Sequence, residues 1–463
     1  MSWGASIAAA SESFQATYLG VKVYEAGGNT GDVAAAVSLA LTYLLPHLNG
    51  LGGDFLALYE REGSVKAVLG LGWAPRGVSA RPPQSGLRSA VVPGYIAGLW
   101  ELHKALGSME WSKLVNMVVD FLERHAVVHP SLAYALSKTE LEGPGAEIYQ
   151  AVPKTAGAPY RLKPLLELYR LAAEHGPQGL YEALAESLSG DYFEREDLTQ
   201  FRAEVREPIS IKYGDWTLYE APPPSLGFAV LLTLKLARDQ LPESPLSYNR
   251  IKAVVAAARR AHWARDKYLG DVPVPLDDIL SGRIQLGEAE TPTPTPGTTY
   301  FAVAGKDVVV SAIQSLYHNF GSRYVEGRWG VVLNNRAYDF TTGPNAPAPR
   351  KRPAHTLSAL LAVRGGEVAA LGSSAAHYRP VVYAQLAQNL IDYSMDPRKV
   401  VWAPRFIWTG RWHVVAERGY EEGPDVEIVD YPSRLGVAAL ALRGDNALAA
   451  VADIRGDGLA LSV

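Results

Sequence analysis

The chain has 463 residues, a formal net charge of −4, 48% hydrophobic and 20% charged residues, and no cysteine. This composition is typical of a globular protein with a substantial core; the charge argues against nucleic acid as a partner, and the lack of cysteine excludes disulfides, thiolate metal sites and cysteine nucleophiles. The N-terminus lacks the basic start and unbroken apolar core of a signal peptide, and no stretch has the roughly 18 apolar residues of a membrane span. We therefore expect a cytoplasmic protein without a membrane partner.

The part of the chain before residue 290 is predicted to be mostly helical. Residues 14–26 have helical apolar spacing that stops at two glycines, and residues 32–45 form a helix so apolar that it should be buried. A glycine-rich turn then leads into a strand and its hairpin partner within 46–72. Further helices are expected over most of 95–140 and 160–190, and over 228–241 and 248–268.

Strand patterns dominate beyond residue 298. Strands are predicted within 298–304, 306–316, 327–335, 355–363 and 366–374, before a helix over 379–394 and more strands up to the C-terminus. These strands are apolar on both faces, so the C-terminal part cannot stand alone. Two stacked sheets with helices outside fit this content.

Three Thr-Pro pairs at 291–296 separate the two parts and end at Gly297, before Thr298 and Thr299. Thr-Pro repeats are common extended linkers and threonine is a good strand residue, so a linker followed by an ordinary strand is one interpretation. The other interpretation is chemical. A threonine hydroxyl can attack the carbonyl before it, giving an ester that water opens, and glycine leaves that carbonyl sterically open. The α-amino group so freed can then act as the base for the same hydroxyl.

Several separate stretches share their order and spacing with one family. They are GGNTGDVAAAV at 27–37, PHLNGLGGDF at 46–55, VPGYIAGL at 92–99, PPPSLG at 222–227, TTY at 298–300, LNN at 333–335 and APRF at 403–406. On these motifs the chain resembles the gamma-glutamyltranspeptidases, which are N-terminal-nucleophile hydrolases, nearly from end to end. The resemblance implies an α+β fold, a four-layer α/β/β/α sandwich. It also implies two intertwined segments of one domain, 1–297 like the family's large subunit and 298–463 like its small subunit.

The resemblance implies roles for the residues around the junction. The precursor would cut itself between Gly297 and Thr298, and Thr298 would become the nucleophile. Ser315 matches a family threonine that hydrogen-bonds the nucleophile, and it keeps the hydroxyl. Asp339 matches the aspartate that binds the α-amino group of the substrate, for which a carboxylate is a natural partner.

Other positions depart from the family. Ala375 and Ala376 stand where the family has two glycines whose backbone N–H groups form the oxyanion hole, and alanine can still provide these donors if φ allows. Two hydroxyl residues that grip the substrate carboxylate are represented by His355 and Thr356. Leu71 replaces an arginine that pairs with the glutamyl α-carboxylate.

Two further replacements fall in the implied substrate pocket, where Tyr317 replaces an asparagine and Arg336 a glutamine. The cleavage machinery is thus retained, whereas the glutamyl clamp is rebuilt. We predict a self-cleaving amidohydrolase that acts on small-molecule amides, either γ-glutamyl compounds such as glutathione or related ones, through an acyl-enzyme on Thr298. No metal or cofactor is implied, and the two fragments should stay associated, with a higher oligomer left open.

Two alternatives stay open. One is an acylase or amidase for a different acyl group, with Arg336 and Tyr317 shaping the pocket. The other is an unprocessed, non-catalytic homologue that only binds a small molecule.

Overall fold

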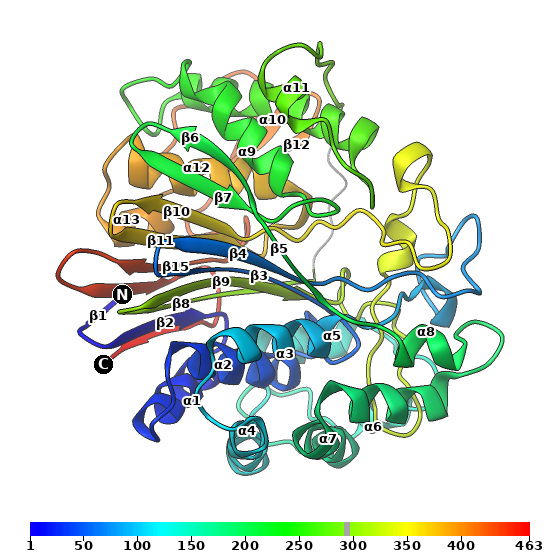
Figure 1. Cartoon of the computed structure of the whole chain (residues 1–463). Coiled ribbons are helices and arrows are strands. Elements are labelled where there is room, and N and C mark those ends of the chain that lie inside the picture. The colour runs from blue at the N-terminus through cyan, green and yellow to red at the C-terminus, as the bar shows by residue number, and fades with distance from the viewer. Residues whose placement is uncertain (291–296) are drawn as a thin grey trace.

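Two seven-stranded sheets stack face to face in the computed structural model, which describes residues 1–290 and 297–463 (Figure 1). Sheet I runs in the order β17 (Leu459–Ser462), β2 (Ile7–Ser11), β8 (Thr299–Gly305), β9 (Val308–Ser315), β3 (Asp54–Arg61), β4 (Ser64–Gly70) and β5 (Glu204–Arg206). Sheet II runs in the order β1 (Ser2–Gly4), β16 (Leu448–Ala452), β15 (Ala438–Arg443), β11 (Glu367–Ser373), β10 (Leu360–Arg364), β7 (Trp216–Glu220) and β6 (Ile209–Tyr213). All neighbouring strands within these two sheets are antiparallel.

Helices cover the outer face of each sheet (Figure 1). Over sheet I lie α1 (Phe14–Glu25), α2 (Thr30–Leu44), α3 (Tyr95–Leu106), α4 (Trp111–His125), α5 (Pro130–Lys138), α6 (Ala146–Gln150), α7 (Lys163–Leu188) and α8 (Arg195–Thr199). Over sheet II lie α9 (Gly227–Arg238), α10 (Tyr248–Tyr268), α11 (Leu276–Leu280), α12 (Arg379–Ile391) and α13 (Pro397–Trp402), with a small sheet of β12 (Phe406–Gly410), β13 (His413–Glu417) and β14 (Val426–Val429). The predicted α+β sandwich of four layers, α/β/β/α, is confirmed.

The inner faces of the two sheets form a dry core between them. Its residues alternate along each strand, with Leu56 of β3, Ala302 of β8, Leu361 of β10 and Ala441 of β15 all fully buried. The ring of Tyr300, in β8 of sheet I, lies against Gly372, in β11 of sheet II. A Cβ on that glycine would approach the tyrosine ring to 2.1 Å, so the close contact requires glycine.

The strongly apolar stretch at 32–45 forms α2, as predicted. Asn29 caps this helix, since its side chain accepts from the N–H of Asp32 while the Asp32 carboxylate accepts from the N–H of Asn29. Nearly every residue of α2 is buried between α1, α3, α4 and sheet I. An apolar surface on all sides of a helix is stable only when neighbours cover it on all sides.

The strand predicted at 327–335 is wrong. Only isolated bridges form here, between Val325 and Val332 and between Gly52 and Leu333. The carboxylate of Glu326 accepts hydrogen bonds from the N–H groups two and three residues further on, which closes a turn instead. A local side-chain acceptor thus wins over the strand propensity of the apolar residues.

Two N-terminal strands, β1 and β2, were not anticipated. The sequence of β2, IAAAS, has weak intrinsic strand propensity, but it is completed as a strand by β17 on one side and β8 on the other. Both sheets therefore mix strands from before and after residue 297. In sheet I, β8 and β9 of the second segment lie between β2 and β3 of the first.

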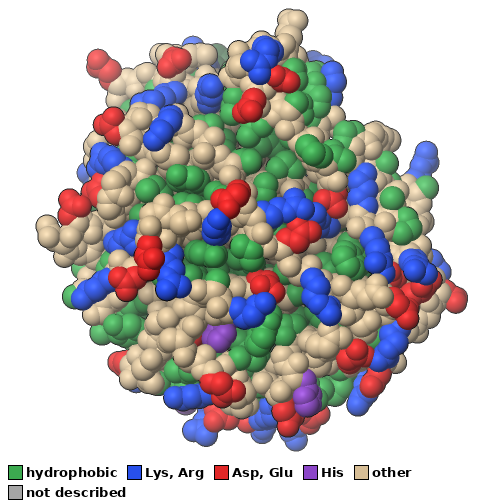
Figure 2. All heavy atoms as spheres, in the orientation of Figure 1, with side chains coloured by type: hydrophobic (Ala, Val, Ile, Leu, Met, Phe, Trp, Pro, Cys, Tyr) green, Lys and Arg blue, Asp and Glu red, His purple; other side chains and the backbone are tan. Residues whose placement is uncertain are grey.

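The visible surface carries acidic and basic side chains mixed together, without a single-sign field that would suit a polyanion (Figure 2). Over the described ranges, the helices are all too short or too polar to cross a membrane.

The interleaved strands predict how a cleaved protein would behave. If the chain is cut before residue 298, separating the fragments would break the β2–β8 and β3–β9 ladders and expose the inter-sheet core. We expect both fragments to elute together in gel filtration without denaturant and to separate only in denaturing electrophoresis. Elution as two independent species under native conditions would contradict this arrangement.

Candidate active site

The register of sheet I places Thr298 opposite Ser315. Strand β8 pairs with β9 from Thr299 and Gln314 onward, and the next position of that register joins Thr298 to Ser315, the last residue of β9. Strand β3 continues the row, because Ser315 also pairs with Asp54. Side chains at paired positions point to the same face of a sheet. All three therefore lie on the face toward sheet II, at one end of the strands.

Three hydrogen bonds join the junction residues. The hydroxyl of Thr298 donates to Ser315 Oγ at 3.1 Å, and Ser315 donates to the carbonyl oxygen of Gly297 at 2.6 Å. The N–H of Tyr317 donates to Ser315 Oγ at 2.8 Å and holds this hydroxyl in place. When Thr298 Oγ1 attacks the Gly297 carbonyl carbon, Ser315 can take the hydroxyl proton and pass its own to the carbonyl oxygen. As the Gly297–Thr298 C–N bond then breaks, the proton on that oxygen passes to the leaving nitrogen and an ester remains, so this route needs no charged base.

Gly297 has a conformation that only glycine adopts readily. Its φ is +136°, and an added Cβ would lie 2.4 Å from the carbonyl carbon of His318. The glycine thus lets the carbonyl approach both Ser315 and Thr298. The Thr-Pro repeat at 291–296 lies outside the described residues, so its interpretation as an arm stays a prediction.

The two alanines predicted for the oxyanion hole lie in the turn between β11 and α12. Ala376 has a φ of +49°, a left-handed conformation that costs a non-glycine residue about 1–2 kcal/mol. In the described part of the chain, the N–H groups of Ala375 and Ala376 donate to no protein acceptor. Arg379 holds the turn by donating to the carbonyl oxygens of Ser373 and Ala376. Both N–H groups are therefore available to an oxyanion, and their role in the oxyanion hole stays a prediction.

Asp339 lies in a second cluster and is already paired. Its Oδ1 accepts a hydrogen bond from the hydroxyl of Tyr317 at 3.0 Å and lies 3.5 Å from Nη2 of Arg265, which reaches in from α10. Burial raises the pKa of Asp339, while Arg265 and Arg336 act in the opposite direction. Oδ2 has no hydrogen-bond partner among the described residues.

Arg336 is fully buried beside this cluster. Its Nη1 donates to Thr356 Oγ1 at 3.1 Å, its Nε lies 3.4 Å from Asp54 Oδ2, and its guanidinium carbon lies 4.4 Å from the Tyr317 ring centre. Nη2 is without a hydrogen-bond partner in the described ranges. His355 Nδ1 lies 3.9 Å from the same Asp54 oxygen, and burial holds the pKa of His355 well below its usual value, so this imidazole is neutral.

Leu71 completes the row of side chains that begins with Thr298. Strand β4 pairs with β3 up to Gly70 and Phe55, so the next position sets Leu71 opposite Asp54. Leu71 is buried in the inter-sheet core. The cation next to Asp54 therefore comes from Arg336, on another segment, and not from position 71.

All five predicted substrate-binding residues meet in this cluster, namely Tyr317, Arg336, Asp339, His355 and Thr356. Sequence reasoning missed Arg265 and Asp54, which carry the charges that compensate Asp339 and Arg336. Asp54 had a signal, because it ends the GLGGD stretch of a motif already singled out. Arg265 had none, since it is one of several charged residues on α10.

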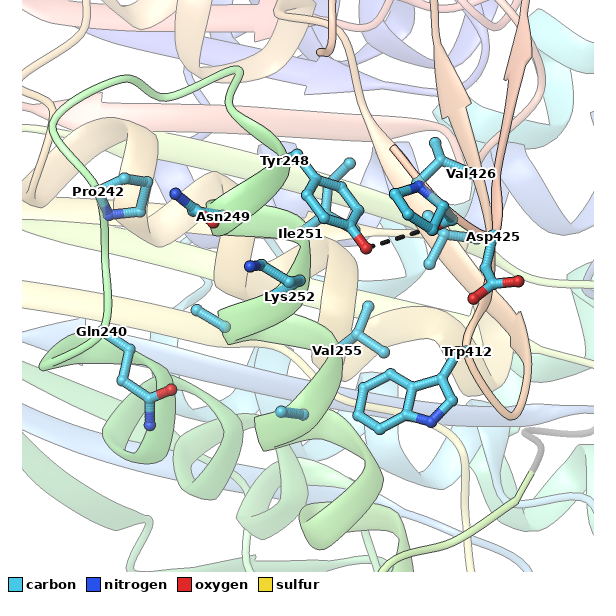
Figure 3. Close-up of a pocket in the computed structure, with 14 residues that line it drawn as sticks. Gln240, Pro242, Tyr248, Asn249, Ile251, Lys252, Val255, Trp412, Asp425 and Val426 are labelled. Atoms are coloured by element: carbon cyan, nitrogen blue, oxygen red, sulfur yellow. Dashed lines mark hydrogen bonds between the residues drawn. The ribbon is translucent and has the colours of Figure 1, made fainter. Parts of the chain in front are cut away.

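A cavity of about 200 Å³ opens beside the junction, lined in part by Glu12, Gly297, Thr298, Asn319 and Ser374. A larger groove of about 600 Å³ lies elsewhere, between α10 and the β13–β14 sheet, where Tyr248 of α10 reaches toward Pro424 and Trp412 lies near Val255 (Figure 3). None of the residues that line this groove belongs to the clusters described above. Size alone therefore does not mark the site of chemistry.

The junction geometry predicts self-cleavage into fragments 1–297 and 298–463, the second beginning TTYFAV. Thr298→Ala should remain whole because it lacks the attacking hydroxyl. Ser315→Ala should slow cleavage, whereas Ser311→Ala, which removes another buried hydroxyl from the same face of β9, should not. Denaturing electrophoresis and N-terminal sequencing give the result. Cleavage of Thr298→Ala at the same bond would exclude this residue as the processing nucleophile.

The buried Arg336–Asp54 pair predicts a pH-dependent loss of stability. Burial raises the pKa of Asp54 from 3.8 to about 6, with Arg336 opposing, so ionising Asp54 destabilises the fold as pH rises through this range. Arg336→Gln leaves the carboxylate unpaired and should lower the free energy of unfolding by about 3 kcal/mol at pH 8. The loss should be smaller at pH 5, where Asp54 is protonated.

Arg364→Gln is the control, since it breaks an exposed pair with Glu367 and should cost under about 1 kcal/mol at either pH. Denaturant unfolding at both pH values measures the difference. Equal losses for Arg336→Gln at pH 5 and pH 8 would contradict an ionised Asp54 as the partner.

Comparisons with known proteins show the family to which the chain belongs. The gamma-glutamyltranspeptidase family matches residues 16–463. The chain is 29% identical to the glutathione hydrolase-like YwrD proenzyme of Bacillus subtilis (strain 168), over 98% of each chain, and 26% identical to the oxamate amidohydrolase proenzyme of Klebsiella pneumoniae, over 91% of this chain and 92% of that one. The crystal structure of cephalosporin acylase from Bacillus halodurans superposes with a TM-score of 0.91 at 26% identity, covering 100% of this chain and 96% of its own. The chain therefore belongs to the gamma-glutamyltranspeptidase family.

Proposed function

We propose that this protein is a self-processing amidohydrolase that removes, from small amides, an acyl group bearing a carboxylate but no ammonium group. The observation that carries this proposal is the pairing of Asp339. Its Oδ1 is held by Tyr317 and Arg265, so the aspartate that would receive an α-ammonium is already compensated within the protein.

Thr298 supplies the nucleophile after the cut. Its own α-amino group takes the hydroxyl proton while Oγ1 bonds to the substrate carbonyl carbon. The N–H groups of Ala375 and Ala376 are the donors for the oxyanion that forms. The amine of the substrate leaves, and water then opens the acyl-enzyme ester.

Charge favours an anionic acyl group over a cationic one. Arg265 and Arg336 both act on Asp339, and Arg336 also pairs with Asp54, so an ammonium group there would meet carboxylates that already have guanidinium partners. Nη1 of Arg336 donates to the hydroxyl oxygen of Thr356, and Nη2 of the same guanidinium has no partner in the described ranges, so this end of Arg336 can bind a carboxylate. Arg336 has no exposed surface in the uncleaved chain, so binding there requires the residues that cover it to move.

The name of one relative supports an acyl group without an ammonium, the oxamate amidohydrolase proenzyme. The second candidate function is glutathione hydrolysis. It is favoured by the unpartnered Oδ2 of Asp339, which could accept an ammonium. It also has support from the YwrD relative and from the glutathione hydrolase proenzyme of Escherichia coli (strain K12), which is 27% identical.

Three substrates separate these functions: γ-glutamyl-p-nitroanilide, glutaryl-p-nitroanilide and pentanoyl-p-nitroanilide. Each differs from the next by a single chemical group. Glutaryl-p-nitroanilide lacks only the amine of the γ-glutamyl compound, and pentanoyl-p-nitroanilide has a methyl group in place of the glutaryl carboxylate. We expect kcat/KM for the glutaryl compound to exceed both others by about tenfold or more, the worth of one charged hydrogen bond. A faster γ-glutamyl reaction would favour glutathione hydrolysis, and a faster pentanoyl reaction would show that Arg336 does not bind substrate.

Thr356→Val tests the carboxylate site directly. It should lower kcat/KM for the glutaryl compound and leave the pentanoyl compound unchanged. Thr233→Val is the matched control, since it removes a buried hydroxyl that bonds only within α9. Equal losses on both substrates for Thr356→Val would place the defect in the fold instead of the carboxylate site.

A further inference from the structure

Glu12 is a buried carboxyl group that the mechanism above does not use. It follows the last residue of β2, and its Oε1 accepts a hydrogen bond from the backbone N–H of Tyr300 at 2.9 Å. Strand β2 pairs with β8 up to Ser11 and Phe301, so the next position of the register sets Glu12 opposite Tyr300. The carboxyl group therefore lies beside the first residues of β8.

Glu12 and Thr298 share one face of sheet I. Glu12 comes two residues after Ala10, and Thr298 two residues before Tyr300; both of these neighbours belong to the inter-sheet core. Thr298 continues the alternation of β8 toward that side, and Glu12, in the bend after β2, lines the same cavity as Thr298. They are diagonal neighbours on adjacent chains, a separation that a long side chain can span.

The backbone nitrogen of Thr298 also points toward Glu12. In an extended antiparallel chain, successive N–H groups point alternately to the two neighbouring strands. The N–H of Tyr300 points toward β2, where Glu12 accepts it, so the nitrogen of Thr298, two residues earlier, points the same way. Both residues line the cavity of about 200 Å³ beside the junction, which leaves room for a freed amino group.

We propose that Glu12 positions the α-amino group of Thr298 in the cleaved protein, by accepting a hydrogen bond from it through Oε2. This rests on the proposed function, because Thr298 acquires an α-amino group only when its bond to Gly297 breaks. In the uncleaved chain the nitrogen is an amide, and Glu12 has no role in the first attack.

In the cleaved protein, Glu12 acts on the α-amine while the amine takes up and releases a proton during the reaction with substrate. As Oγ1 of Thr298 bonds to the substrate carbonyl, the hydroxyl proton moves to the α-amine, which becomes an ammonium. The Glu12 carboxylate accepts a hydrogen bond from that ammonium and keeps its remaining N–H directed at the substrate. When the substrate C–N bond breaks, the proton passes to the leaving nitrogen and the α-amine is neutral again.

Several groups bear on the ionisation of this carboxyl. Burial raises the pKa of Glu12 to about 8, and the negative charge of Asp453 acts in the same direction. Hydrogen bonds from the N–H of Tyr300 and the hydroxyl of Ser374, and the positive charge of Arg379, lower this pKa. The same cavity also presents His47, Arg434, Arg455 and Asp457. An ammonium next to Glu12 favours the carboxylate, and the carboxylate in turn raises the pKa of the amine.

The test measures this effect on the amine without any substrate. In the processed protein, the rate at which acetic anhydride acetylates the Thr298 α-amine is followed against pH by mass spectrometry of the peptide that begins TTYFAV. Only the neutral amine reacts. In Glu12→Gln, which keeps an acceptor for the N–H of Tyr300, cleavage should proceed as before. The midpoint of the Thr298 α-amine titration should fall by about one pH unit or more. The pH at which kcat/KM declines on the acid side should fall by the same amount.

Glu220→Gln is the matched control. Glu220 is another fully buried glutamate that accepts from a serine hydroxyl and a backbone N–H, those of Ser358 and Ala359, but it lies in β7 of sheet II. Its variant should leave the midpoint in place. An unchanged midpoint in Glu12→Gln, an equal shift in Glu220→Gln, or failure of Glu12→Gln to cleave would each overturn the role of Glu12. A wild-type protein without N-terminal Thr298 would overturn the proposed function, and this inference with it.

Discussion

The antiparallel pairing of β8 with its neighbours is the constraint on which the site depends. One register brings Thr298, Ser315 and Asp54 into a row across three strands, and extending it to β2 places Glu12 beside them. A slip of β8 by one residue in this register would turn Thr298 to the opposite face of the sheet, into the helix layer and away from Ser315. The apolar alternation that fills the inter-sheet core therefore also holds the catalytic row in place, since the core side chains allow only one register.

The same row explains why cleavage need not disturb the fold. Gly297 precedes β8 and its carbonyl is bonded to the hydroxyl of Ser315, whereas the ladders that hold β8 begin at Thr299. Breaking the bond before Thr298 thus removes no ladder hydrogen bond from sheet I. Strands of both segments remain interleaved, so the chain's new end is fixed by the sheet around it. A nucleophile that is also an N-terminus would otherwise lie on a fraying segment.

The site also contains a cluster of charged side chains that are largely removed from water. Asp54, Arg336, Asp339 and Arg265 are all largely removed from water, and each is stabilised mainly by one of the others. Such pairs are weak contributors to stability, because desolvation offsets most of their attraction. These pairs do restrict which ligands can bind at the site, since a charged group on a ligand must find a partner among side chains that are already paired with one another. Polar atoms that lack partners within the described ranges, Nη2 of Arg336 and Oδ2 of Asp339, mark where a ligand group could bind.

Some features of the protein could be predicted from the sequence, because they depend on residues that are close together along the chain. Residues 32–45 had to form a buried helix because they are apolar on every side. The Gly297–Thr298 bond became the candidate for cleavage through the resemblance to the gamma-glutamyltranspeptidases, with which an open carbonyl before a hydroxyl agrees. The local sequence was not enough for β2, whose strand conformation comes from its neighbours, nor for 327–335, where the Glu326 side chain competes with the ladder.

In the site, the motifs named Tyr317, Arg336, Asp339 and Thr356, and the chain does bring them together. Arg265, Asp54 and Glu12 lie far from these residues in the sequence and belong to other elements, so only the tertiary structure showed that they meet. Their charge state is decided by burial, and burial does not exist until the two sheets and their helices have packed. The sequence by itself determined which bond could break and which hydroxyl could break it; the packing of sheets I and II decided which charges surround that hydroxyl, because solvent exclusion is a property of the assembled layers and not of any one segment.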